Sequence, residues 1–510
     1  MPFPEDFLWG ASESGFQFEM GDELKKYVDS NTDWFKWVHD EHNISRGIVS
    51  GDLPEDGVNY WLLYELDHIY AMKLGLNSYR IGIEWSRIFP TSTKKISVDV
   101  SRDGDNIISN IVIDRDTLER LDSIANKNAV EHYRKIILDL RNKKFKVIVC
   151  LNHFTLPLWI HDPIKTRERK GKNVDNGWIN EDTIIEFTKY AAYISWKLGD
   201  IVDMWATFNE PMVVTEAGFL LPESGFPPGI KDFNLFLKAS RNIAVAHAMA
   251  YNAIKTFDEI TGYKDSKSSA EIGIIHNINP VMPLNKNKDI DLKASELLDY
   301  SHNKMILDAT VNGLLVKDFI KRKSVYKNYL HNKVDWIGVN YYTRMVVKGK
   351  RLIPFISFTP IFPEIVEGYG YNCKPNNFSK DNRPTSDFGW EIYPEGLIGA
   401  IEIASKYGKP MYITENGIAD KDDKIRPKFI VLHLSQLEHI LEKKYDINGY
   451  FHWALTDNYE WAQGFRMKFG LIEVNLKTKK RIPRKSYEML RKIIMDKSVS
   501  EDLVKKYKLP

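Results

Sequence analysis

The chain has 510 residues, of which 43% are hydrophobic, so it holds enough apolar side chains for a large core and lacks the composition of a disordered protein. Lysine and arginine together number 71 and aspartate and glutamate 69, which leaves a formal net charge of +2. This balance argues against a nucleic-acid or membrane surface as the main partner.

The N-terminal segment MPFPEDFLWG lacks the basic region and the apolar run of a secretory signal. No uninterrupted apolar stretch of about 18 residues predicts a membrane-spanning helix. The two cysteines, Cys150 and Cys373, are too few for a disulfide framework, and we therefore expect a protein of the reducing cytoplasm.

Eight short segments along the chain have the character of β-strands. Several of them are nearly continuous apolar runs, as expected for parallel strands that are covered on the outside by helices. In chain order the predicted strands are 7–12, 78–85, 146–154, 204–209, 271–278, 336–343, 411–417 and 450–457.

The segments between these strands have the three-to-four-residue period of helices that pack on one face. The pattern is clearest over 184–198, where Gly199 provides a stop signal, and it recurs over 130–140 and 434–441. Eight β–α alternations without a glycine-rich phosphate-binding turn predict an α/β fold, a (β/α)8 TIM barrel, rather than a doubly wound sheet.

Two insertions interrupt the alternation. Residues 91–128 are polar and contain ISVDV, then Asp103-Gly104, then NIVI, which predicts a surface β-hairpin. Residues 344–390 are rich in proline and aromatic residues and are not periodic. A loop of this length at the C-terminal face of a barrel is usually functional, so we expect it to shape a substrate entrance, with a decorative surface insertion as the alternative. Because no linker or internal repeat is visible, residues 1–510 are predicted to form a single barrel domain.

If these segments are barrel strands, their C-terminal ends converge on the face where barrel enzymes hold their chemistry. The polar and aromatic residues at or just beyond these ends are Gln17, Arg80, Asn152, His153, Asn209, Glu210, Asn340, Tyr341, Tyr342, Glu415, Asn416, Trp453, Asp457, Glu460 and Trp461. Two carboxylates, Glu210 and Glu415, come from the fourth and the seventh strand, and we expect them to lie roughly opposite each other across the barrel.

A facing pair of glutamates is typical of the hydrolysis of glycosidic bonds. One carboxyl group must be protonated to give a proton to the leaving oxygen, and the other must be ionised to attack or stabilise the anomeric carbon. A separation of about 5–5.5 Å leads to retention and one of about 6.5–9.5 Å to inversion, and the sequence does not specify this distance. Arg80 could hold one of the two carboxylates ionised.

Each of these residues also has a structural alternative. A single glutamate at a strand end can cap a loop or pair with a surface lysine, but two of them, each beside an asparagine, make this interpretation less favoured. Taken alone, His153 fits a core histidine and Arg80 a structural ion pair. Trp453 and Trp461, taken alone, fit core packing.

The chain resembles the family 1 glycoside hydrolases, the retaining β-glycosidases, and most closely their archaeal branch of β-glucosidase and β-galactosidase enzymes. The resemblance runs from FLWGASESGFQFE near the start to HWALTDNYEWAQGFRMKFGLIEV near the end, and so covers nearly the whole chain. Its most specific feature is the pair of motifs TFNEP and ITENG, which occur in that order about 200 residues apart.

This resemblance implies a role for each residue of the motifs. Glu210 would be the general acid/base and Glu415 the nucleophile, while Asn209 would hold the sugar 2-hydroxyl. The residues that would contact Glu415 or complete the site beside it are Arg80, Tyr342 and Asn340. The residues that would bind the hydroxyls of the non-reducing sugar or stack beneath it are Gln17, His153, Trp453, Glu460 and Trp461. No metal or other cofactor is implied.

The resemblance further implies an exo-acting retaining enzyme that removes terminal β-D-glucosyl or β-D-galactosyl residues from oligosaccharides and aryl glycosides. The charge of Glu415 would keep the pKa of Glu210 high until the covalent glycosyl-enzyme forms, and Glu210 would then act as a base. Fucosyl and mannosyl substrates, and transglycosylation onto a sugar acceptor, are expected as extensions. Because the archaeal relatives are commonly tetramers, a homo-oligomer, tetramer or dimer, is expected, with no nucleic-acid or membrane partner.

The alternative within this class is a 6-phospho-β-glycosidase. Such relatives replace the glutamate of the NYEW segment with serine and carry a lysine and a tyrosine downstream that hold the phosphate. Here the three positions are Glu460, Met467 and Phe469. The charge of Glu460 would repel a phosphate, which disfavours a phosphorylated sugar, although Lys468 is adjacent.

Two alternatives belong to other classes. A metal-dependent aldolase or amidohydrolase would need ligands at several strand ends, and His153 and His276 are the only strand-end histidines before the eighth strand. A non-catalytic sugar-binding barrel is the other alternative, and the presence of both Glu210 and Glu415 argues against it.

Overall fold

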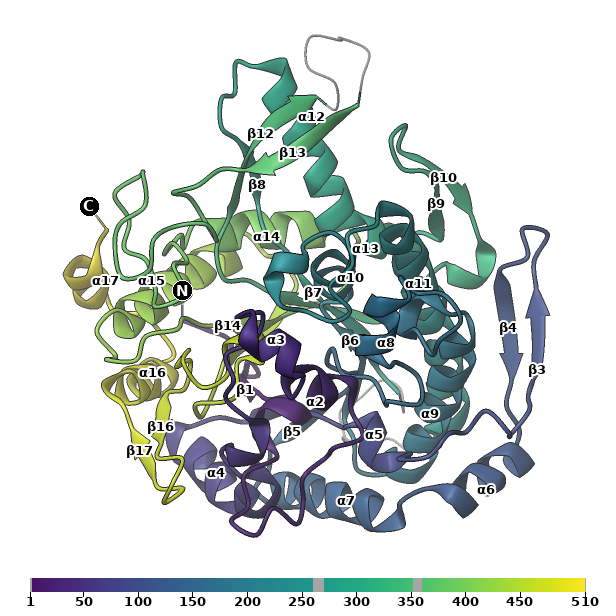
Figure 1. The fold of residues 1–510 in the computed structure, drawn as a ribbon. Coiled ribbons are helices and arrows are strands. Elements are labelled where there is room, and N and C mark those ends of the chain that lie inside the picture. The colour runs from purple at the N-terminus through teal and green to yellow at the C-terminus, as the bar shows by residue number, and fades with distance from the viewer. Residues whose placement is uncertain (1, 260–269, 352–359, 510) are drawn as a thin grey trace.

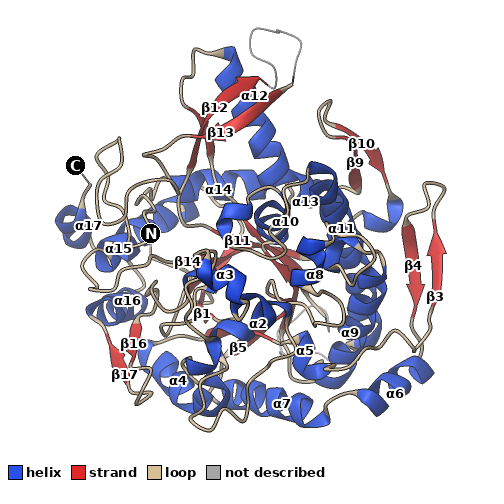
Figure 2. Ribbon diagram, in the orientation of Figure 1, coloured by secondary structure: helices blue, strands red, loops and turns tan. Residues whose placement is uncertain are grey.

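The centre of the protein, as seen in a computed structural model that describes residues 2–259, 270–351 and 360–509, is a closed barrel of parallel strands ringed by helices (Figures 1 and 2). The barrel contains one strand from each of the eight predicted segments, so the predicted (β/α)8 fold is confirmed. In their order around the barrel the strands are β1 (Leu8–Ser12), β15 (Ile447–His452), β14 (Met411–Asn416), β11 (Trp336–Asn340), β7 (Ile272–Asn277), β6 (Met204–Asn209), β5 (Lys146–Asn152) and β2 (Ser78–Gly82).

The helices cover the outer face of the barrel, as Figure 2 shows, because their apolar faces need a partner. The larger helices are α4 (Tyr60–Leu74), α7 (Lys127–Asn142), α9 (Asp182–Leu198), α11 (Phe233–Phe257), α14 (Gly396–Ser405), α15 (Arg426–Leu441) and α16 (Lys485–Asp496). Three of them, α7, α9 and α15, contain the periodic segments of the sequence. Every residue of β6, β7, β11 and β14 is buried, which explains why these strands are nearly free of alternating polar residues.

Side chains from the strands fill the inside of the barrel. Ile148, Met204 and Ile275 belong to one buried cluster with Trp336 and Phe451, all contributed by barrel strands. The interior of the barrel is therefore a packed core, and a ligand can bind only at the end where the C-termini of the strands lie.

Several predicted strand boundaries were wrong at the C-terminal end. The second predicted strand, 78–85, ends at Gly82, and the sixth, 336–343, ends at Asn340. The eighth, predicted as 450–457, is Ile447–His452, so Trp453 follows the strand instead of lying within it. In each case the residues that follow the strand no longer pair in the barrel, although most of their side chains are buried.

Shorter elements lie between the barrel strands along the chain or follow the last of them, β15. The helices among them are α1 (Gly15–Phe18), α2 (Asp33–Val38), α3 (Glu41–Ser45), α5 (Trp85–Ile88), α8 (Pro163–Glu168), α10 (Pro211–Phe219), α12 (Asp289–Leu298), α13 (Met305–Thr310) and α17 (Glu501–Tyr507). Two hairpins are β9 (Leu314–Asp318) with β10 (Lys323–Tyr326), and β16 (Ile472–Val474) with β17 (Arg481–Pro483). In the described part of the chain, no helix is long and apolar enough to span a membrane.

The first insertion, 91–128, contains the antiparallel pair β3 (Asp99–Arg102) and β4 (Ile108–Val112), with Asp103-Gly104 in the turn. It also contains the helix α6 (Arg115–Ile124), which the hairpin prediction did not include. Figure 1 shows the hairpin beside β9–β10 at the edge of the molecule, and the Nζ atom of Lys327 lies 2.6 Å from the Asp103 carboxylate. The predicted surface hairpin is thus anchored at its turn.

The second insertion, 344–390, is not structureless as its composition suggested. It contains β12 (Met345–Arg351) and β13 (Ile361–Ile365), which pair antiparallel, and β12 also pairs with β8 (Val281–Pro283). Residues 352–359 of this insertion lie outside the described residues. Figure 1 shows that this small sheet and α12 project from the ring of helices.

Candidate active site

The C-terminal ends of the barrel strands surround a cavity of about 380 Å³. Residues that end or follow strands β5, β6, β7, β11, β14 and β15 line it, and they include His153, Asn209, Glu210, Asn277, Tyr342, Glu415, Trp453, Glu460 and Trp461. Gln17, Arg80 and Asn340 are buried and contact residues of this wall. All the residues that the family resemblance assigns to the site therefore meet at one end of the barrel.

Glu415, near the end of β14, is held by one cation and one phenol. Arg80 donates from Nη1 to one carboxylate oxygen of Glu415 at 2.7 Å, and Tyr342 donates from its hydroxyl to the other oxygen at 2.6 Å. The guanidinium of Arg80 is completely buried, and it also donates to Oδ1 of Asn209 at 2.9 Å. These contacts fix the orientation of the Glu415 carboxylate.

Glu210 has different partners: among the described residues, only amide groups donate hydrogen bonds to its carboxyl group. The Nδ2 atoms of Asn340 and Asn277 donate to the same oxygen, Oε1, at 2.8 Å and 3.1 Å. Glu210 lies between β6 and α10, with a backbone φ of 48° in the left-handed region, and Pro211 begins the helix. A non-glycine residue rarely adopts this conformation, and such residues concentrate at functional sites.

The strands that carry the two glutamates, β6 and β14, are not directly opposite each other in the barrel. In the barrel order β11 and β7 lie between β14 and β6 on one side, and β15, β1, β2 and β5 lie on the other. Asn340, at the end of β11, lies on the shorter arc, where its Nδ2 donates to Oε1 of Glu210 at 2.8 Å and to Oδ1 of Asn209 at 3.0 Å. Its amide also lowers the pKa of Glu415.

The surroundings separate the proton affinities of the pair. Burial raises the pKa of Glu210, the charge of Glu415 raises it further, and the result is about 7. Burial also raises the pKa of Glu415, but the charge of Arg80 and the hydrogen bonds from Tyr342, Arg80 and Asn340 oppose this effect. Glu415 is thus held as an anion by a cation and a phenol, whereas among the described residues no cation donates a hydrogen bond to Glu210.

A third carboxyl group, Glu460, borders the same cavity. Gln17 reaches it with Nε2 at 3.4 Å and also donates to the backbone carbonyl of Tyr459 at 3.0 Å. Burial and the charges of Glu415 and Glu210 raise the pKa of Glu460 to about 8. Glu460 is therefore mostly protonated at neutral pH, and its expected repulsion of a phosphate is weaker than the sequence suggests.

The wall near Glu460 is aromatic. The ring of His153 lies 5.8 Å from that of Trp453 and 5.9 Å from that of Trp461, nearly parallel to both. Burial and the charge of Arg80 hold the pKa of His153 well below its usual value, so its ring is neutral. Flat apolar faces beside polar groups match the two kinds of surface that a sugar presents.

Several cavity residues are absent from the sequence prediction. Asn277 ends β7, and the polar strand-end signal that identified the other residues would have identified it as well. Glu216 and His302 come from helical segments outside the barrel, and no strand-end signal points to them. Phe388 and Trp390 belong to the second insertion, which therefore contributes to the cavity as predicted.

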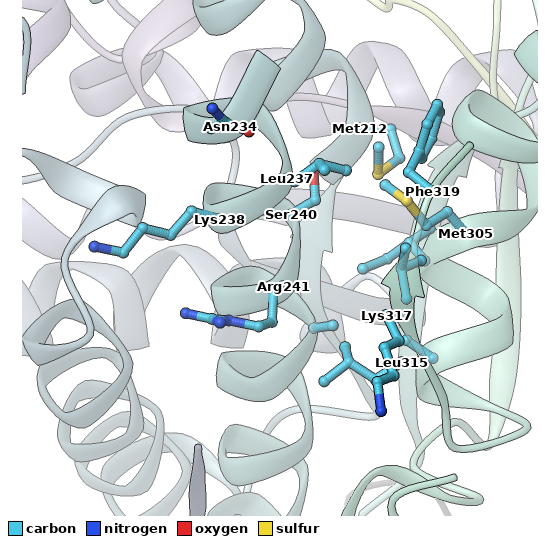
Figure 3. Close-up of a pocket in the computed structure, with 14 residues that line it drawn as sticks. Met212, Asn234, Leu237, Lys238, Ser240, Arg241, Met305, Leu315, Lys317 and Phe319 are labelled. Atoms are coloured by element: carbon cyan, nitrogen blue, oxygen red, sulfur yellow. The ribbon is translucent and has the colours of Figure 1, made fainter. Parts of the chain in front are cut away.

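A second cavity, of about 320 Å³, lies outside the barrel between α11, α13 and β9 (Figure 3). Met212, Met305 and Phe319 face one another there, whereas Lys238 and Arg241 extend away from them, as Figure 3 shows. None of the 14 described residues that line this cavity is acidic, so it has no group that matches the carboxyl pair of the barrel mouth.

A parallel barrel with two differently held glutamates, a buried arginine and aromatic walls at its C-terminal end defines the class of barrel enzymes that work with a carboxyl pair. The described residues contain no group of three or more histidine, cysteine, aspartate or glutamate side chains that could hold a metal ion.

The comparisons with known proteins agree with this class. Glycosyl hydrolase family 1 matches residues 1–102 and 121–499, and the chain belongs to this family and is a glycoside hydrolase. A β-galactosidase from Pyrococcus woesei is 54% identical over 511 residues, which cover 98% of each chain. The resemblance to the archaeal branch of the family is thereby confirmed.

Solved structures give the same result. The β-glycosidase from Thermosphaera aggregans superposes with a TM-score of 0.90 at 40% identity over 100% of both chains. A β-glucosidase mutant derived from a hyperthermophilic tetrameric structure has a TM-score of 0.87 at 41% identity and covers 100% of this chain and 98% of that one.

Proposed function

We propose that the protein is a retaining exo-β-glycosidase that removes terminal β-glucosyl or β-galactosyl residues by double displacement, with Glu415 as nucleophile and Glu210 as acid/base. The observation that carries the proposal is the unequal pair: Glu210 with a pKa of about 7 and amide partners only, and Glu415 in contact with Arg80 and Tyr342. The names of the relatives, β-galactosidase and β-glucosidase, support the substrate class.

The chemistry follows from these surroundings. Glu415 attacks the anomeric carbon while Glu210 protonates the leaving oxygen, and a covalent ester between sugar and Glu415 results. The ester no longer carries the charge that raises the pKa of Glu210, so Glu210 stays ionised until it accepts a proton from the incoming water. Retention is proposed from the family to which the chain belongs, since the sequence resemblance is to retaining β-glycosidases.

The cavity favours neutral sugars over 6-phosphorylated ones. None of the described residues that line it is lysine or arginine, and Lys468 contributes its backbone carbonyl to Arg426 and to the amide of Asp420 outside the cavity. A phosphate would therefore enter without a lysine or arginine as counter-ion, and His302, whose pKa is raised, is already paired with Glu216. The lack of a lysine or arginine among these residues disfavours a phosphate more strongly than the partly neutral Glu460 does.

Further properties rest on the family. Fucosyl substrates and transglycosylation onto sugar acceptors are proposed for the same site, since the covalent intermediate can react with any hydroxyl that reaches it. A homo-oligomer, tetramer or dimer, is proposed from the tetrameric origin stated for one structural relative. A single barrel domain over residues 1–510 is proposed because the sequence shows no linker, and a cytoplasmic location because its two cysteines are too few for a disulfide framework.

The test is kinetic and stereochemical. We expect aryl β-glucoside and β-galactoside to be cleaved efficiently and the glucoside 6-phosphate poorly, with the β-anomer as the first-formed product in proton NMR. Glu210→Gln and Glu415→Gln should each reduce kcat/KM for a phenyl glycoside by about 10²–10⁴ or more. Glu186→Gln, which changes a buried carboxyl group on α9 beside Lys189, is the matched control. An α-anomer as first product, or turnover that survives both changes, would refute the proposal.

A further inference from the structure

A histidine–carboxylate pair, His302 and Glu216, lines the same cavity as Glu210. Nδ1 of His302 is 2.8 Å from Oε2 of Glu216, and the His302 side chain is almost completely buried. Glu216 lies on α10, the helix that directly follows Glu210, and His302 lies in a π-helical segment, Asp299–Lys304, between α12 and α13. Such π-helical turns inside α-helices are found mostly at functional sites.

The other ring nitrogen of His302 faces two amides that lead to Glu210. Nε2 is 3.0 Å from Nδ2 of Asn279 and 3.3 Å from Oδ1 of Asn277. Asn279 donates to the same Oδ1 of Asn277, and Asn277 donates from Nδ2 to Oε1 of Glu210 at 3.1 Å. The hydroxyl of Tyr371 donates to Oδ1 of Asn279 at 2.9 Å and so turns Nδ2 of Asn279 towards Asn277.

The orientation of the Asn277 amide in this series of hydrogen bonds matters, because an amide side chain can rotate by 180° and exchange its oxygen and nitrogen. If Asn277 turned over, its oxygen would face Oε1 of Glu210 and would favour the proton on that oxygen. With the observed orientation, Asn277 and Asn340 both donate to Oε1, so the proton of the acid must reside on Oε2. The orientation of Asn277 therefore decides which oxygen of Glu210 can protonate a substrate.

His302 keeps that orientation in both of its protonation states. Glu216 holds a proton on Nδ1, so a neutral ring presents a bare Nε2 that accepts from Asn279. A protonated ring donates from Nε2 to Oδ1 of Asn277 instead. Either way, Oδ1 of Asn277 faces His302 and Nδ2 faces Glu210.

We propose that His302 and Glu216 form a positioning pair for the acid/base Glu210, acting through the amide of Asn277. The pair makes no bond to substrate in this proposal; it sets the hydrogen-bonding direction that leaves Oε2 of Glu210 as the proton donor. This inference rests on the proposed role of Glu210.

The charged groups around His302 come from several elements. Burial lowers its pKa, but the charge and the hydrogen bond of Glu216 and the charges of Glu210 and Asp299 raise it above the usual value. His276, on β7, bonds through Nε2 to the backbone carbonyl of His302, and its own pKa is lowered to about 3, so it stays neutral. Loss of Glu216 should therefore make His302 easier to deprotonate.

The decisive measurement compares leaving groups. A dinitrophenyl glycoside expels its leaving group without a proton, whereas a phenyl or alkyl glycoside needs the acid. For His302→Phe we expect kcat/KM to fall about tenfold or more with the alkyl glycoside and less than about threefold with the dinitrophenyl glycoside. Glu216→Gln keeps the shape of the side chain but replaces the charged partner of Nδ1, so it should show the same leaving-group dependence to a smaller extent, and it serves if His302→Phe folds poorly.

A matched pair elsewhere provides the control. His68 on α4 is equally buried and lies 2.6 Å from the carboxylate of Asp139, but its other partner is Tyr60. His68→Phe should lower stability without changing the ratio between the two leaving groups. An equal loss of kcat/KM on both glycosides in His302→Phe, or in Glu216→Gln if His302→Phe folds poorly, would overturn the inference.

Glu210→Gln separates this inference from the function on which it rests. If Glu210→Gln shows the strong leaving-group dependence and the His302 and Glu216 variants do not, only the positioning pair is refuted. If Glu210→Gln shows no such dependence, the acid/base role itself is refuted, and the positioning pair is refuted with it.

Discussion

Glu210 and Glu415 carry the same side chain, and only their neighbours distinguish them. Both are buried, which raises the pKa of each carboxyl group. Arg80 and Tyr342 contact Glu415, whereas Glu210 receives two amide donors on one oxygen. A guanidinium stabilises a carboxylate far more than an amide does, so Glu415 is the more strongly stabilised anion of the two, and the proposed division of roles rests on this difference.

The prediction at the scale of residues concerns the protonation of Glu210 and the pH dependence of kcat/KM that follows from it. With a pKa of about 7, Glu210 holds its proton below neutral pH, so kcat/KM should fall as the pH rises through that value. In Glu415→Gln the pKa of Glu210 should be lower, because the repulsion by Glu415 is lost, but still above the ordinary value because Glu210 remains buried. A carbon-13 or infrared titration of the Glu210 carboxyl measures this directly. An unchanged or higher pKa in Glu415→Gln, with Glu186→Gln as the reference, would contradict the electrostatic explanation.

At the scale of elements, the second insertion adds residues to the wall of the cavity at the barrel mouth. Its hairpin β12–β13 extends the small sheet that starts at β8, and its later residues return to the cavity. Phe388 stacks on Trp390 with ring centroids 4.5 Å apart, and Trp390 in turn lies 5.3 Å from Tyr342. The insertion therefore joins the outer wall of the cavity to the residue that holds Glu415.

The prediction at this scale concerns Phe388→Ala. Loss of its ring should raise KM for an oligosaccharide about three- to tenfold, because a stacking surface is removed, while kcat/KM for a small aryl glycoside changes little. Phe378→Ala is the matched control, since Phe378 belongs to the same insertion, is 58% exposed and is not among the described cavity residues. Equal effects of the two substitutions would show that the insertion does not contact the substrate beyond the first sugar.

At the scale of the whole molecule, buried ion pairs join segments that are far apart in the sequence. Strand β1 pairs with both β2 and β15, so the first and the last barrel strands close the ring. Beyond β15, Arg481 in β17 forms two hydrogen bonds of 2.8 Å to the carboxylate of Asp67 on α4, and both side chains are fully buried. This pair attaches the C-terminal hairpin to the first half of the barrel.

We predict that Asp67→Asn lowers the free energy of unfolding by about 3–5 kcal/mol, because it leaves the guanidinium of Arg481 buried without a counter-ion. Chemical denaturation or the Tm measures the loss. Lys505→Gln, which removes one side of the exposed pair with Glu501, should change stability by less than about 1 kcal/mol. Similar small effects of both substitutions would indicate that solvent reaches Arg481 once Asp67 is changed.

Much of the fold and of the site is predictable from the chain alone, because the signals of barrel strands are local. Their apolar runs and polar C-terminal ends are adjacent in sequence, so the strand pattern by itself pairs Glu210 with Glu415. Asn277 carries the same signal, although the prediction did not include it. His302 and Glu216 carry none, since a histidine in a helical segment does not reveal which strand end it faces.

The sequence by itself determined the barrel, the face that carries the site and the two carboxyl groups, because these depend on period and position along single strands. Only the tertiary structure decided the order of the strands, which places β11 and β7 between the glutamates, and the contacts that give Glu210 and Glu415 unequal proton affinities. The physical reason is that burial and charge act through space. Arg80 lies far from Glu415 along the chain, but across the barrel its guanidinium is 2.7 Å from that carboxylate.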